Sequence, residues 1–451
     1  MHVFGSSGVR GVAGADLTPR FVLQIAQAAG SAWADDHGRV AVGRDTRTTG
    51  QTFADAATSG LTSLGLDVDR LGIVPTPGLQ AYCERTEVPG LMVTASHNPP
   101  AYNGVKVIGA DGVGLTRDAL NRIETTLAEE DVTHVGWAET GTARRVESAR
   151  RTYREAVVAA VDAERIAAAD LTVVVDPGHG AGSLVSPDLF RELGCTVHTV
   201  HAQPDGHFPG RDPEPVAEHL GDLRTYVEST DADLGIAHDG DADRAMFVDE
   251  RGRHVPGESS LAALAAAELE AGDTVVSAVN ASQRLVDVVE DAGAALSLSP
   301  IGSTNIVSRI RDLTAAGESV PIAGEGNGGL FFPRYRVARD GAYTAARFCE
   351  LVAETPASEL VDPYSDYHTV RRALEYEAEA EREAMLDRIE AHATDAAADL
   401  DTTDGWRLDY GDAWVLARPS GTEPIVRVYA EARDVDRARS LADELVDVAR
   451  A

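Results

Sequence analysis

The sequence predicts an α/β fold class, with three similar mixed-sheet α/β domains followed by a distinct C-terminal α+β domain. Three observations support this. The 451 residues are too many for one hydrophobic core. Short apolar runs alternate with helical patterns, and this alternation begins three times along the chain. The last ~85 residues instead combine a long helix, hairpin-like strands and a closing helix. We expect domains over residues 1–140, 141–252, 253–360 and 361–451.

The first domain is predicted from its apolar periodicity and its helix-start signals. Thr18 and Pro19 begin a helix that runs to about Trp33, because proline suits the first turn of a helix. A second helix covers residues 49–64. Strands are expected at 39–43, 91–93 and 104–108. The polar stretch near 128–148 marks a domain boundary.

The later domains repeat the pattern and then depart from it. Further strands are expected at 171–175, 234–237, 274–278 and 320–323, and a hairpin joins 245–248 to 253–255. Residues 355–364 have the composition of a linker. A long helix near 376–397 and a closing helix from about residue 433 belong to the terminal domain.

The chain is strongly acidic, with 73 Asp and Glu against 40 Lys and Arg and a formal net charge of −33. Such a surface repels nucleic acid and anionic membranes, so neither is an expected partner. No apolar run approaches the length of a membrane span, and the first residues do not resemble a signal sequence. We expect a cytoplasmic protein with three reduced cysteines, adapted to high salt that screens its self-repulsion.

Ser96 is the first candidate for chemistry. It follows an apolar strand and precedes Asn98, Pro99 and Pro100, which stiffen the chain beyond it. A serine hydroxyl is a weak nucleophile and needs a base or a metal. The alternative interpretation of Ser96 is a helix N-cap.

Three aspartates follow another apolar strand at alternating positions: Asp239, Asp241 and Asp243. Closely spaced carboxylates suit Mg²⁺, which prefers few carboxylates plus a phosphate oxygen. An EF-hand would need glycine at its sixth position, where this chain has Arg244. A solvated acidic turn is the other alternative, and burial of the preceding strand argues against it.

Lys106 is the only lysine among 40 basic residues, ten positions after Ser96. Arginine does not readily release its proton, whereas a desolvated lysine can, so Lys106 is a candidate base. Its survival by chance in an arginine-biased composition is the alternative.

Two further polar loops could hold a substrate. Glu325 and Asn327 lie in a glycine-rich loop and could bond vicinal hydroxyls of a sugar, although such loops are also common turns. The second loop offers guanidinium groups, hydroxyls and backbone N–H groups to a phosphate, from Arg418, Ser420, Gly421, Thr422 and Arg427. A polar β-turn with arginines paired to surface acids is its alternative. The chain lacks a Walker A run and a kinase glycine loop, so no nucleotide donor is indicated.

The chain resembles the α-D-phosphohexomutase family, over essentially its whole length. The residues 94–99 (Thr-Ala-Ser-His-Asn-Pro) resemble the family's phosphoserine loop, 239–244 its metal loop and 418–424 its phosphate loop. The residues 4–11 and 43–47 resemble two further family segments. The sugar loop departs from the common pattern, because Asn327 and Gly329 stand where many members have serine and histidine, as in the archaeal variant.

The resemblance implies four domains around a central cleft and a phosphohexomutase, an isomerase of phosphomannomutase/phosphoglucomutase type acting on hexose phosphates. Phosphorylated Ser96 would exchange its phosphoryl group with the 1- or 6-hydroxyl through a hexose 1,6-bisphosphate, which also serves as activator. One Mg²⁺ per chain would be held by the three aspartates and Ser96. Lys106 would transfer the proton, with Arg10, His97 and Arg244 supporting the transferring group.

Three other functions compete with this one. Phosphoglucosamine mutase is the alternative within the family. A metal-dependent sugar phosphatase would not need the second phosphate loop, and a non-catalytic sugar-phosphate sensor would not need Ser96, Lys106 and the aspartates together. The sequence carries no signal for the oligomeric state.

Overall fold

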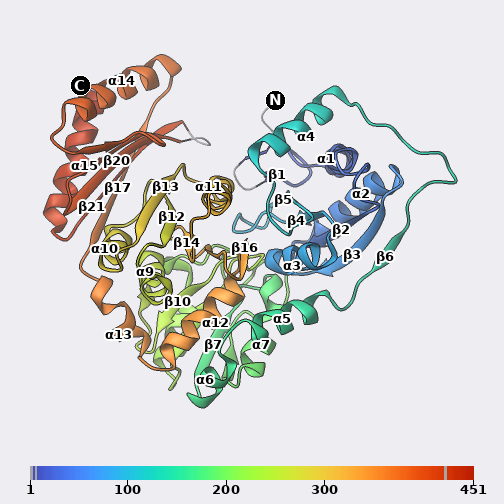
Figure 1. Ribbon diagram of the computed structural model, residues 1–451, viewed down its shortest axis with the longest axis horizontal. Helices are drawn as coiled ribbons and strands as arrows, with labels where there is room; N and C mark the ends of the chain where they lie inside the picture. Colours follow the sequence, from blue (N-terminus) through green and yellow to red (C-terminus); the bar gives the residue numbers. More distant parts are fainter. Residues whose placement is uncertain (1–3, 6–7, 421–423) are drawn as a thin grey trace. The chain divides into compact units, whose positions relative to one another are not determined.

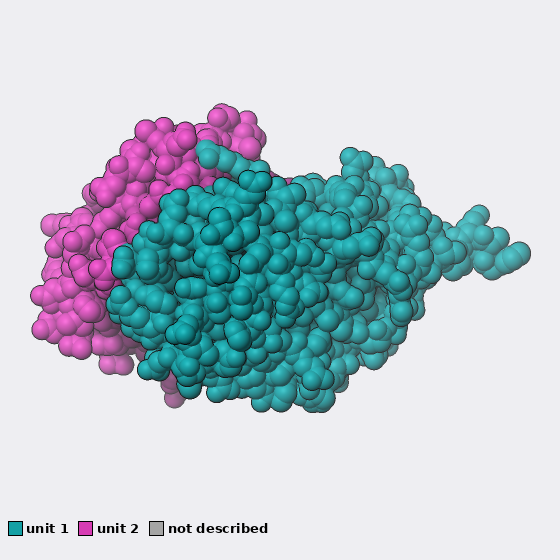
Figure 2. Space-filling view, turned by 90° about the horizontal axis from the view of Figure 1, so that it is seen from below, with its two compact units in different colours: residues 1–260, 327–360 teal, residues 261–326, 361–451 magenta. Residues whose placement is uncertain are grey.

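The computed structural model describes residues 4–5, 8–420 and 424–451 (Figure 1). The chain forms two compact units, which Figure 2 colours separately. Unit 1 contains residues 1–260 and 327–360, and unit 2 contains residues 261–326 and 361–451. Within the described residues, no helix has the length and apolar character needed to cross a membrane.

The first sheet lies in unit 1 and is mixed, with strand order β1-β5-β4-β2-β3-β6. Its antiparallel pairs are β1–β5 and β4–β5, whereas β2 pairs in parallel with β4 and β3, and β3 with β6. Its strands are β1 (Val9–Val12), β2 (Arg39–Arg44), β3 (Asp67–Ile73), β4 (Gly90–Val93), β5 (Tyr102–Ile108) and β6 (Ala143–Arg145). The predicted strands at 39–43, 91–93 and 104–108 are thereby confirmed.

Helices cover both faces of this sheet (Figure 1). One apolar core joins the sheet to α1 (Pro19–Ser31), α2 (Gly50–Thr62) and α4 (Arg117–Glu129), and a second core joins it to α3 (Thr76–Thr86) and the start of α5 (Ala149–Ala159). Thr18 caps α1, its Oγ1 accepting a hydrogen bond from the Phe21 N–H at 3.2 Å, which confirms the predicted helix start. The strand β6 lies inside the polar stretch predicted as a boundary.

The second sheet, also mixed, has strand order β11-β10-β9-β7-β8. Parallel pairing joins β7 to β8 and β9, and antiparallel pairing joins β10 to β9 and β11. The predicted hairpin is therefore confirmed as β10–β11. The elements are β7 (Thr172–Asp176), β8 (Thr196–Thr199), β9 (Leu234–Ala237), β10 (Met246–Asp249), β11 (His254–Val255), α6 (Ala163–Ala168), α7 (Ser186–Glu192), α8 (Gly221–Glu228) and the 3-10 turns η1 (Ala181–Leu184) and η2 (Ala217–His219).

The third α/β region is divided between the two units. In unit 2, β12 (Thr274–Ala278) pairs in parallel with β13 (Ala295–Ser299) and β14 (Ala323–Gly324). In unit 1, β15 (Leu330–Phe332) and β16 (Arg336–Arg339) pair antiparallel. The helices of the region are α9 (Gly257–Glu268), α10 (Gln283–Asp291), α11 (Ser303–Ala315) and α12 (Gly341–Val352).

Two predictions in this region are wrong in detail. Residues 320–322 precede β14 rather than forming a strand. The predicted linker at 355–364 contains α13 (Ala357–Val361) and the 3-10 turn η3 (Asp362–Tyr364). Glu250 explains the order at the start of α13, since its carboxylate accepts hydrogen bonds from the backbone N–H and the hydroxyl of Ser358.

The C-terminal domain lies in unit 2 and has a different architecture. Its sheet is antiparallel throughout, with strand order β17-β21-β20-β19-β18. The strands are β17 (His368–Glu375), β18 (Asp399–Asp401), β19 (Trp406–Asp409), β20 (Ala413–Pro419) and β21 (Ile425–Ala432). One apolar core joins this sheet to α14 (Glu379–Asp395) and α15 (Val435–Arg450). This confirms the predicted α+β domain and both of its helices.

Candidate active site

Ser96 lies in unit 1 on the serine loop, which comprises residues 94–101 between β4 and β5. Its φ of 52° places this non-glycine residue in the left-handed region, and its side chain is fully buried. The hydroxyl donates a hydrogen bond to Oδ2 of Asp239 at 2.6 Å. None of the described helices begins at residue 97, so the N-cap interpretation of Ser96 is wrong.

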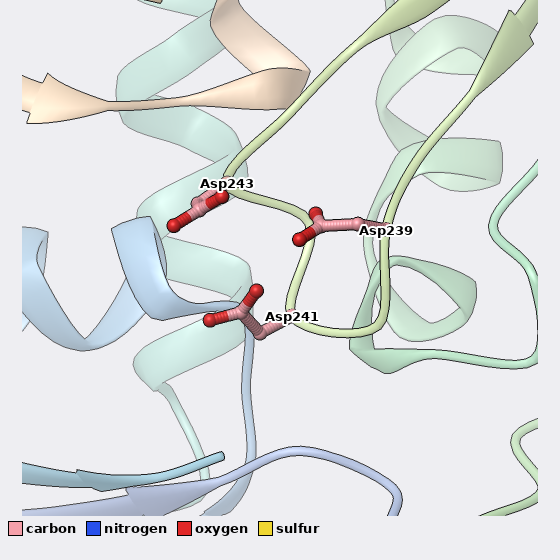
Figure 3. Close-up of side chains that lie close together, drawn as sticks. All are labelled: Asp239, Asp241 and Asp243. Atoms are coloured by element: carbon pink, nitrogen blue, oxygen red, sulfur yellow. The ribbon is translucent and has the colours of Figure 1, made fainter. Parts of the chain in front are cut away.

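The three aspartates lie on one tight loop after β9, with their side chains close together (Figure 3). All three are buried, and one carboxylate oxygen of each lies within 4.8 Å of the others. Oδ1 of Asp241 and Oδ1 of Asp243 are buried without a hydrogen-bond partner among the described residues. Buried carboxylate oxygens that lack a partner are what a hard divalent cation requires, so these residues fit Mg²⁺.

Lys106 on β5 points into this aspartate cluster. Its Nζ lies 2.7 Å from Oδ2 of Asp241 and 2.9 Å from Oδ2 of Asp243. Arg339, at the end of β16, also donates to Oδ2 of Asp243, at 2.6 Å. The only lysine of the chain is therefore in contact with the predicted metal ligands.

Burial alone would raise the pKa of every carboxyl in the cluster. Around Asp241 the Lys106 charge outweighs burial and holds the pKa below its usual value. Around Asp243 burial is likewise outweighed, by Arg339 and then Lys106. Asp239 has no comparable cation, so burial and its two neighbouring carboxylates raise its pKa to about 8. The carboxyl that accepts the Ser96 hydrogen bond is thus the least compensated of the three.

Two arginines, Arg10 and Arg244, contact residues of the serine loop that follow Ser96. Nη2 of Arg244 donates to Nδ1 of His97 at 2.9 Å, and Nη1 of Arg10 donates to Oδ1 of Asn98 at 2.8 Å. Burial, then the charges of Arg244 and Arg10, lower the pKa of His97 to about 2. His97 is therefore a neutral hydrogen-bond acceptor here, not a cation beside the serine.

Sequence reasoning missed the residues that hold the serine loop. The buried guanidinium of Arg47 donates to four carbonyl oxygens, those of Ser96, Asn98, Pro99 and Tyr102, at 2.6–2.9 Å. Its Nε donates to Oδ2 of Asp45 at 3.0 Å. The only available signal was the resemblance of residues 43–47 to a family segment, which assigned no role to Arg47.

Asp45 also holds the backbone N–H of Ser96 in place, through Thr94. Its Oδ2 accepts from Oγ1 of Thr94 at 2.7 Å, and that oxygen in turn accepts from the Ser96 N–H at 2.8 Å. One buried carboxylate therefore fixes the Ser96 carbonyl through Arg47 and the Ser96 amide through Thr94. This network compensates the unfavourable left-handed backbone of the serine.

The metal loop, residues 239–244, approaches the serine loop closely where Gly240 lies against the backbone carbonyl of Ser96. A Cβ on Gly240 would lie only 2.6 Å from the carbonyl oxygen of Ser96, so glycine is required for this approach. Thr76, at the start of α3, donates both its N–H and its hydroxyl to Asp241. Thr76 had no sequence signal, because a lone threonine 165 positions from its partner has no pattern to mark it.

The predicted sugar loop is divided between the units. Asn327 lies in unit 1, where its Oδ1 accepts from the Gly329 N–H at 3.0 Å. The adjacent Gly328 carbonyl accepts from the Ala245 N–H at 3.0 Å, which brings this half of the loop to the end of the metal loop. Glu325 belongs to unit 2.

The predicted phosphate loop lies in unit 2, between β20 and β21. Arg418 and Arg427 are direct partners across these strands, so two guanidiniums face the same side of the sheet. Asp404 contacts Nε of Arg418 at 3.1 Å, and the Ser420 N–H donates to the Ile425 carbonyl at 2.9 Å. Gly421 and Thr422 lie outside the described residues.

Comparison with protein-family models decides the classification. Four models match in chain order, described as phosphoglucomutase/phosphomannomutase alpha/beta/alpha domains I, II and III and the C-terminal domain. They match residues 1–134, 151–252, 256–367 and 374–448. The chain belongs to the phosphoglucomutase/phosphomannomutase family. The predicted resemblance and four-domain fold class are thus confirmed.

Individual members of the family are similar along their whole length. A phosphoglucomutase/phosphomannomutase of Thermococcus kodakarensis is 40% identical over 97% of this chain and 96% of its own. A Methanopyrus kandleri protein named "Probable phosphoglucosamine mutase" is 39% identical over 99% and 97%. A crystal structure of a family protein from Burkholderia thailandensis has a TM-score of 0.87 and 28% identity, covering 99% of this chain and 97% of that one.

Proposed function

We propose that this protein is a phosphohexomutase that interconverts hexose 1-phosphate and hexose 6-phosphate, of phosphoglucomutase/phosphomannomutase type. One observation carries the proposal: the Ser96 hydroxyl lies 2.6 Å from Asp239, within a buried aspartate cluster that also holds the only lysine of the chain. A hydroxyl, a metal-ligand set and an amine are the parts that phosphoryl transfer requires.

Ser96 carries the phosphoryl group in the proposed reaction. The bond between the Ser96 oxygen and phosphorus breaks as a hydroxyl oxygen of the hexose phosphate forms its bond to phosphorus. The sugar hydroxyl passes its proton to Lys106, which acts here as the neutral amine, and the Ser96 oxygen leaves with the electron pair of its bond to phosphorus. The product is a hexose 1,6-bisphosphate. After the bisphosphate reorients, the Ser96 oxygen takes up its other phosphoryl group, Lys106 returns the proton to the sugar oxygen that leaves, and the phosphoserine is restored. A trace of the bisphosphate would therefore activate unphosphorylated protein.

The surrounding residues stabilise charge and geometry. Mg²⁺, held by Asp239, Asp241, Asp243 and the Ser96 phosphoryl group, would neutralise charge that develops on the transferring group. Arg10 and Arg244 supply fixed cations next to the serine loop. His97, neutral in these surroundings, orients the Arg244 guanidinium by accepting from it.

The phosphate that does not react would bind at the C-terminal domain. The facing guanidiniums of Arg418 and Arg427 match a phosphate dianion, and like charges at directly opposed strand positions favour an anion between them. Ser420, Gly421 and Thr422 would add hydroxyl and N–H donors, and Glu325 and Asn327 would bond the sugar hydroxyls.

Phosphoglucosamine mutase is the second candidate, and the name of the Methanopyrus kandleri relative favours it. A coupled assay on glucose, mannose and glucosamine phosphates, with Mg²⁺, a trace of the matching bisphosphate and high salt, separates the two. The highest kcat/KM on glucose or mannose phosphate supports the main proposal. A kcat/KM at least tenfold higher on glucosamine phosphate would replace it with the alternative. If activity is highest without added salt, the expectation that the protein is adapted to high salt is wrong.

The same assay distinguishes the enzyme from its rivals. A phosphatase would release inorganic phosphate from glucose 1-phosphate without forming glucose 6-phosphate. A sensor would fail to incorporate phosphate at Ser96 from a hexose 1,6-bisphosphate, which intact mass measurement detects.

The metal assignment is tested with Asp241→Asn, which removes one ligand charge. Activity should fall, and the Mg²⁺ concentration for half-maximal activity should rise at least tenfold. Asp404→Asn is the matched control for the Mg²⁺ response alone, because Asp404 contacts Arg418 and is not one of the clustered aspartates. It should leave the Mg²⁺ concentration for half-maximal activity unchanged, whatever the lost contact with Arg418 does to phosphate binding. An unchanged Mg²⁺ response in Asp241→Asn would exclude it from the ligand set.

A further inference from the structure

A cavity lies in unit 1, against the first sheet and apart from the serine loop. It has a volume of about 390 Å³ and is lined by residues of β2, β3, β6 and the first turns of α2. That volume is in the range of small-molecule sites. None of its lining residues belongs to the serine, metal, sugar or phosphate loops.

The lining is basic in a chain that is otherwise acidic. The cavity is lined by four arginines, Arg44, Arg70, Arg144 and Arg145, but by only one acidic residue, Asp55. The whole chain has 73 acidic residues against 40 basic ones, so this concentration of positive charge departs from the rest of the chain. Positive charge gathered in a concave site attracts anions.

The single carboxylate of the lining is already engaged. Oδ1 of Asp55 accepts a hydrogen bond from Arg70 and another, at 2.9 Å, from Nε2 of Gln51. Arg144 is paired with Asp69, which lies outside the lining. Neither Asp55 nor Asp69 forms an ion pair with the other two arginines of the lining.

Arg44 and Arg145 are those two arginines. Arg44 donates from Nη1 to the Asp45 carbonyl at 3.0 Å, but its buried Nε has no hydrogen-bond partner among the described residues. Arg145 is exposed and forms no ion pair with any residue that the structure describes. It lies directly opposite Arg70 in the register of β3 and β6. Asp55 pairs with Arg70 and not with Arg145, so one carboxylate serves these two neighbouring guanidiniums.

We propose that this cavity, here named the arginine pocket, is a second anion site that binds a small molecule carrying at least one phosphoryl dianion. Guanidinium groups present planar, paired donors that match phosphate oxygens, and Arg44 and Arg145 line one cavity. The dianion neutralises the positive charge of the lining arginines that do not pair with Asp55 or Asp69.

The arginine pocket and the serine loop are connected through the end of β2, where Arg44 lines the pocket and the next residue, Asp45, holds the serine loop. Arg44 contacts the Asp45 carbonyl, and the Asp45 side chain holds Arg47 and Thr94. A ligand on Arg44 would therefore act on a side chain that donates to the backbone of Asp45, and the carboxylate of Asp45 positions Ser96, which gives the ligand a route to influence turnover. The pocket binds its ligand whether or not the proposed mutase function is correct.

Hydrogen exchange measured by mass spectrometry tests the site on the full-length protein. Inorganic pyrophosphate and fructose 1,6-bisphosphate are the two probes, because the phosphoryl dianion could belong to an inorganic ion or to a sugar. Either probe should slow exchange at residues 143–145 and 50–55, with a saturable midpoint. The probe with the lower midpoint identifies the source.

Arg145→Glu is the test variant, and Arg151→Glu, exposed on α5 outside the pocket, is its matched control. Arg145→Glu should raise the midpoint at least tenfold, whereas Arg151→Glu should leave it within twofold, and both should keep their turnover without probe. Equal midpoints in the two variants, equal slowing by sulfate, or no slowing with either probe would overturn the proposal.

Discussion

Replacing Arg47 by methionine isolates the network that positions Ser96. The change removes the donors to four carbonyls of the serine loop and leaves the buried Asp45 carboxylate without its cation. Loss of one partner from a buried ion pair costs about 3–5 kcal/mol of unfolding free energy. The expected Arg47→Met protein is therefore less stable, with Ser96 no longer fixed in its left-handed conformation.

Stability and positioning are separated by adding Asp45→Asn. The double variant has no unpaired buried charge, so it should regain about half or more of the lost unfolding free energy, measured by urea denaturation. It still lacks the guanidinium that holds the Ser96 carbonyl. Since a misplacement of about 1 Å costs roughly 100-fold in rate, kcat should stay about 100-fold below wild type in both variants, with little change in KM.

The coupled mutase assay gives kcat and KM for the wild-type protein and both variants. If the double variant regains turnover along with stability, Arg47 serves only folding and the positioning argument is refuted. A kcat within twofold of wild type in Arg47→Met alone would refute it as well.

Three further predictions concern other residues. Lys106→Arg keeps the charge but not a readily released proton, so turnover should fall by about 100-fold or more, and near-normal kcat would exclude Lys106 as the base. Gly240→Ala should lower kcat by about tenfold or more, because its Cβ pushes on the Ser96 carbonyl, whereas Gly221→Ala, with open space at its Cβ, should not. Burial would raise the pKa of Asp176, but the neighbouring Arg211 and His201 outweigh the effect of burial and hold this pKa below its usual value. The ionised carboxylate therefore stabilises the fold above its unfolded pKa of about 3.9, and this stabilisation is lost as the pH falls toward its lower folded pKa. Asp176→Asn should accordingly lose less unfolding free energy than wild type between about pH 5 and pH 3.

Local sequence signals predicted the parts of the fold that local physics determines. Apolar runs marked strands such as β2 and β9, and Pro19 with its capping threonine marked the start of α1. The start of α13 depends instead on hydrogen bonds from Ser358 to Glu250, more than 100 positions away. The charged residues of β6 gave no strand signal, because that strand forms only where β3 offers it an edge.

The candidate site shows the same division. Ser96, Lys106 and the three aspartates could be predicted, because each stood out in composition or spacing. Arg339 could not, as it is one of 39 arginines and meets Asp243 only through the fold. Arg47 was hidden for the same reason. The predicted roles of the site residues stay predictions until variants are measured, and the three boundaries between the four domains also stay predictions.

The contact of Lys106 with Asp241 and Asp243 has a consequence for handling the protein. The amine and the neighbouring Arg339 place positive charge against these carboxylates. Many small metal-binding domains unfold on chelation, because nothing else compensates their ligands. Here the polypeptide supplies its own counter-charge. Chelation should therefore stop turnover while circular dichroism and the unfolding temperature change little, and returning Mg²⁺ should restore activity without a refolding step.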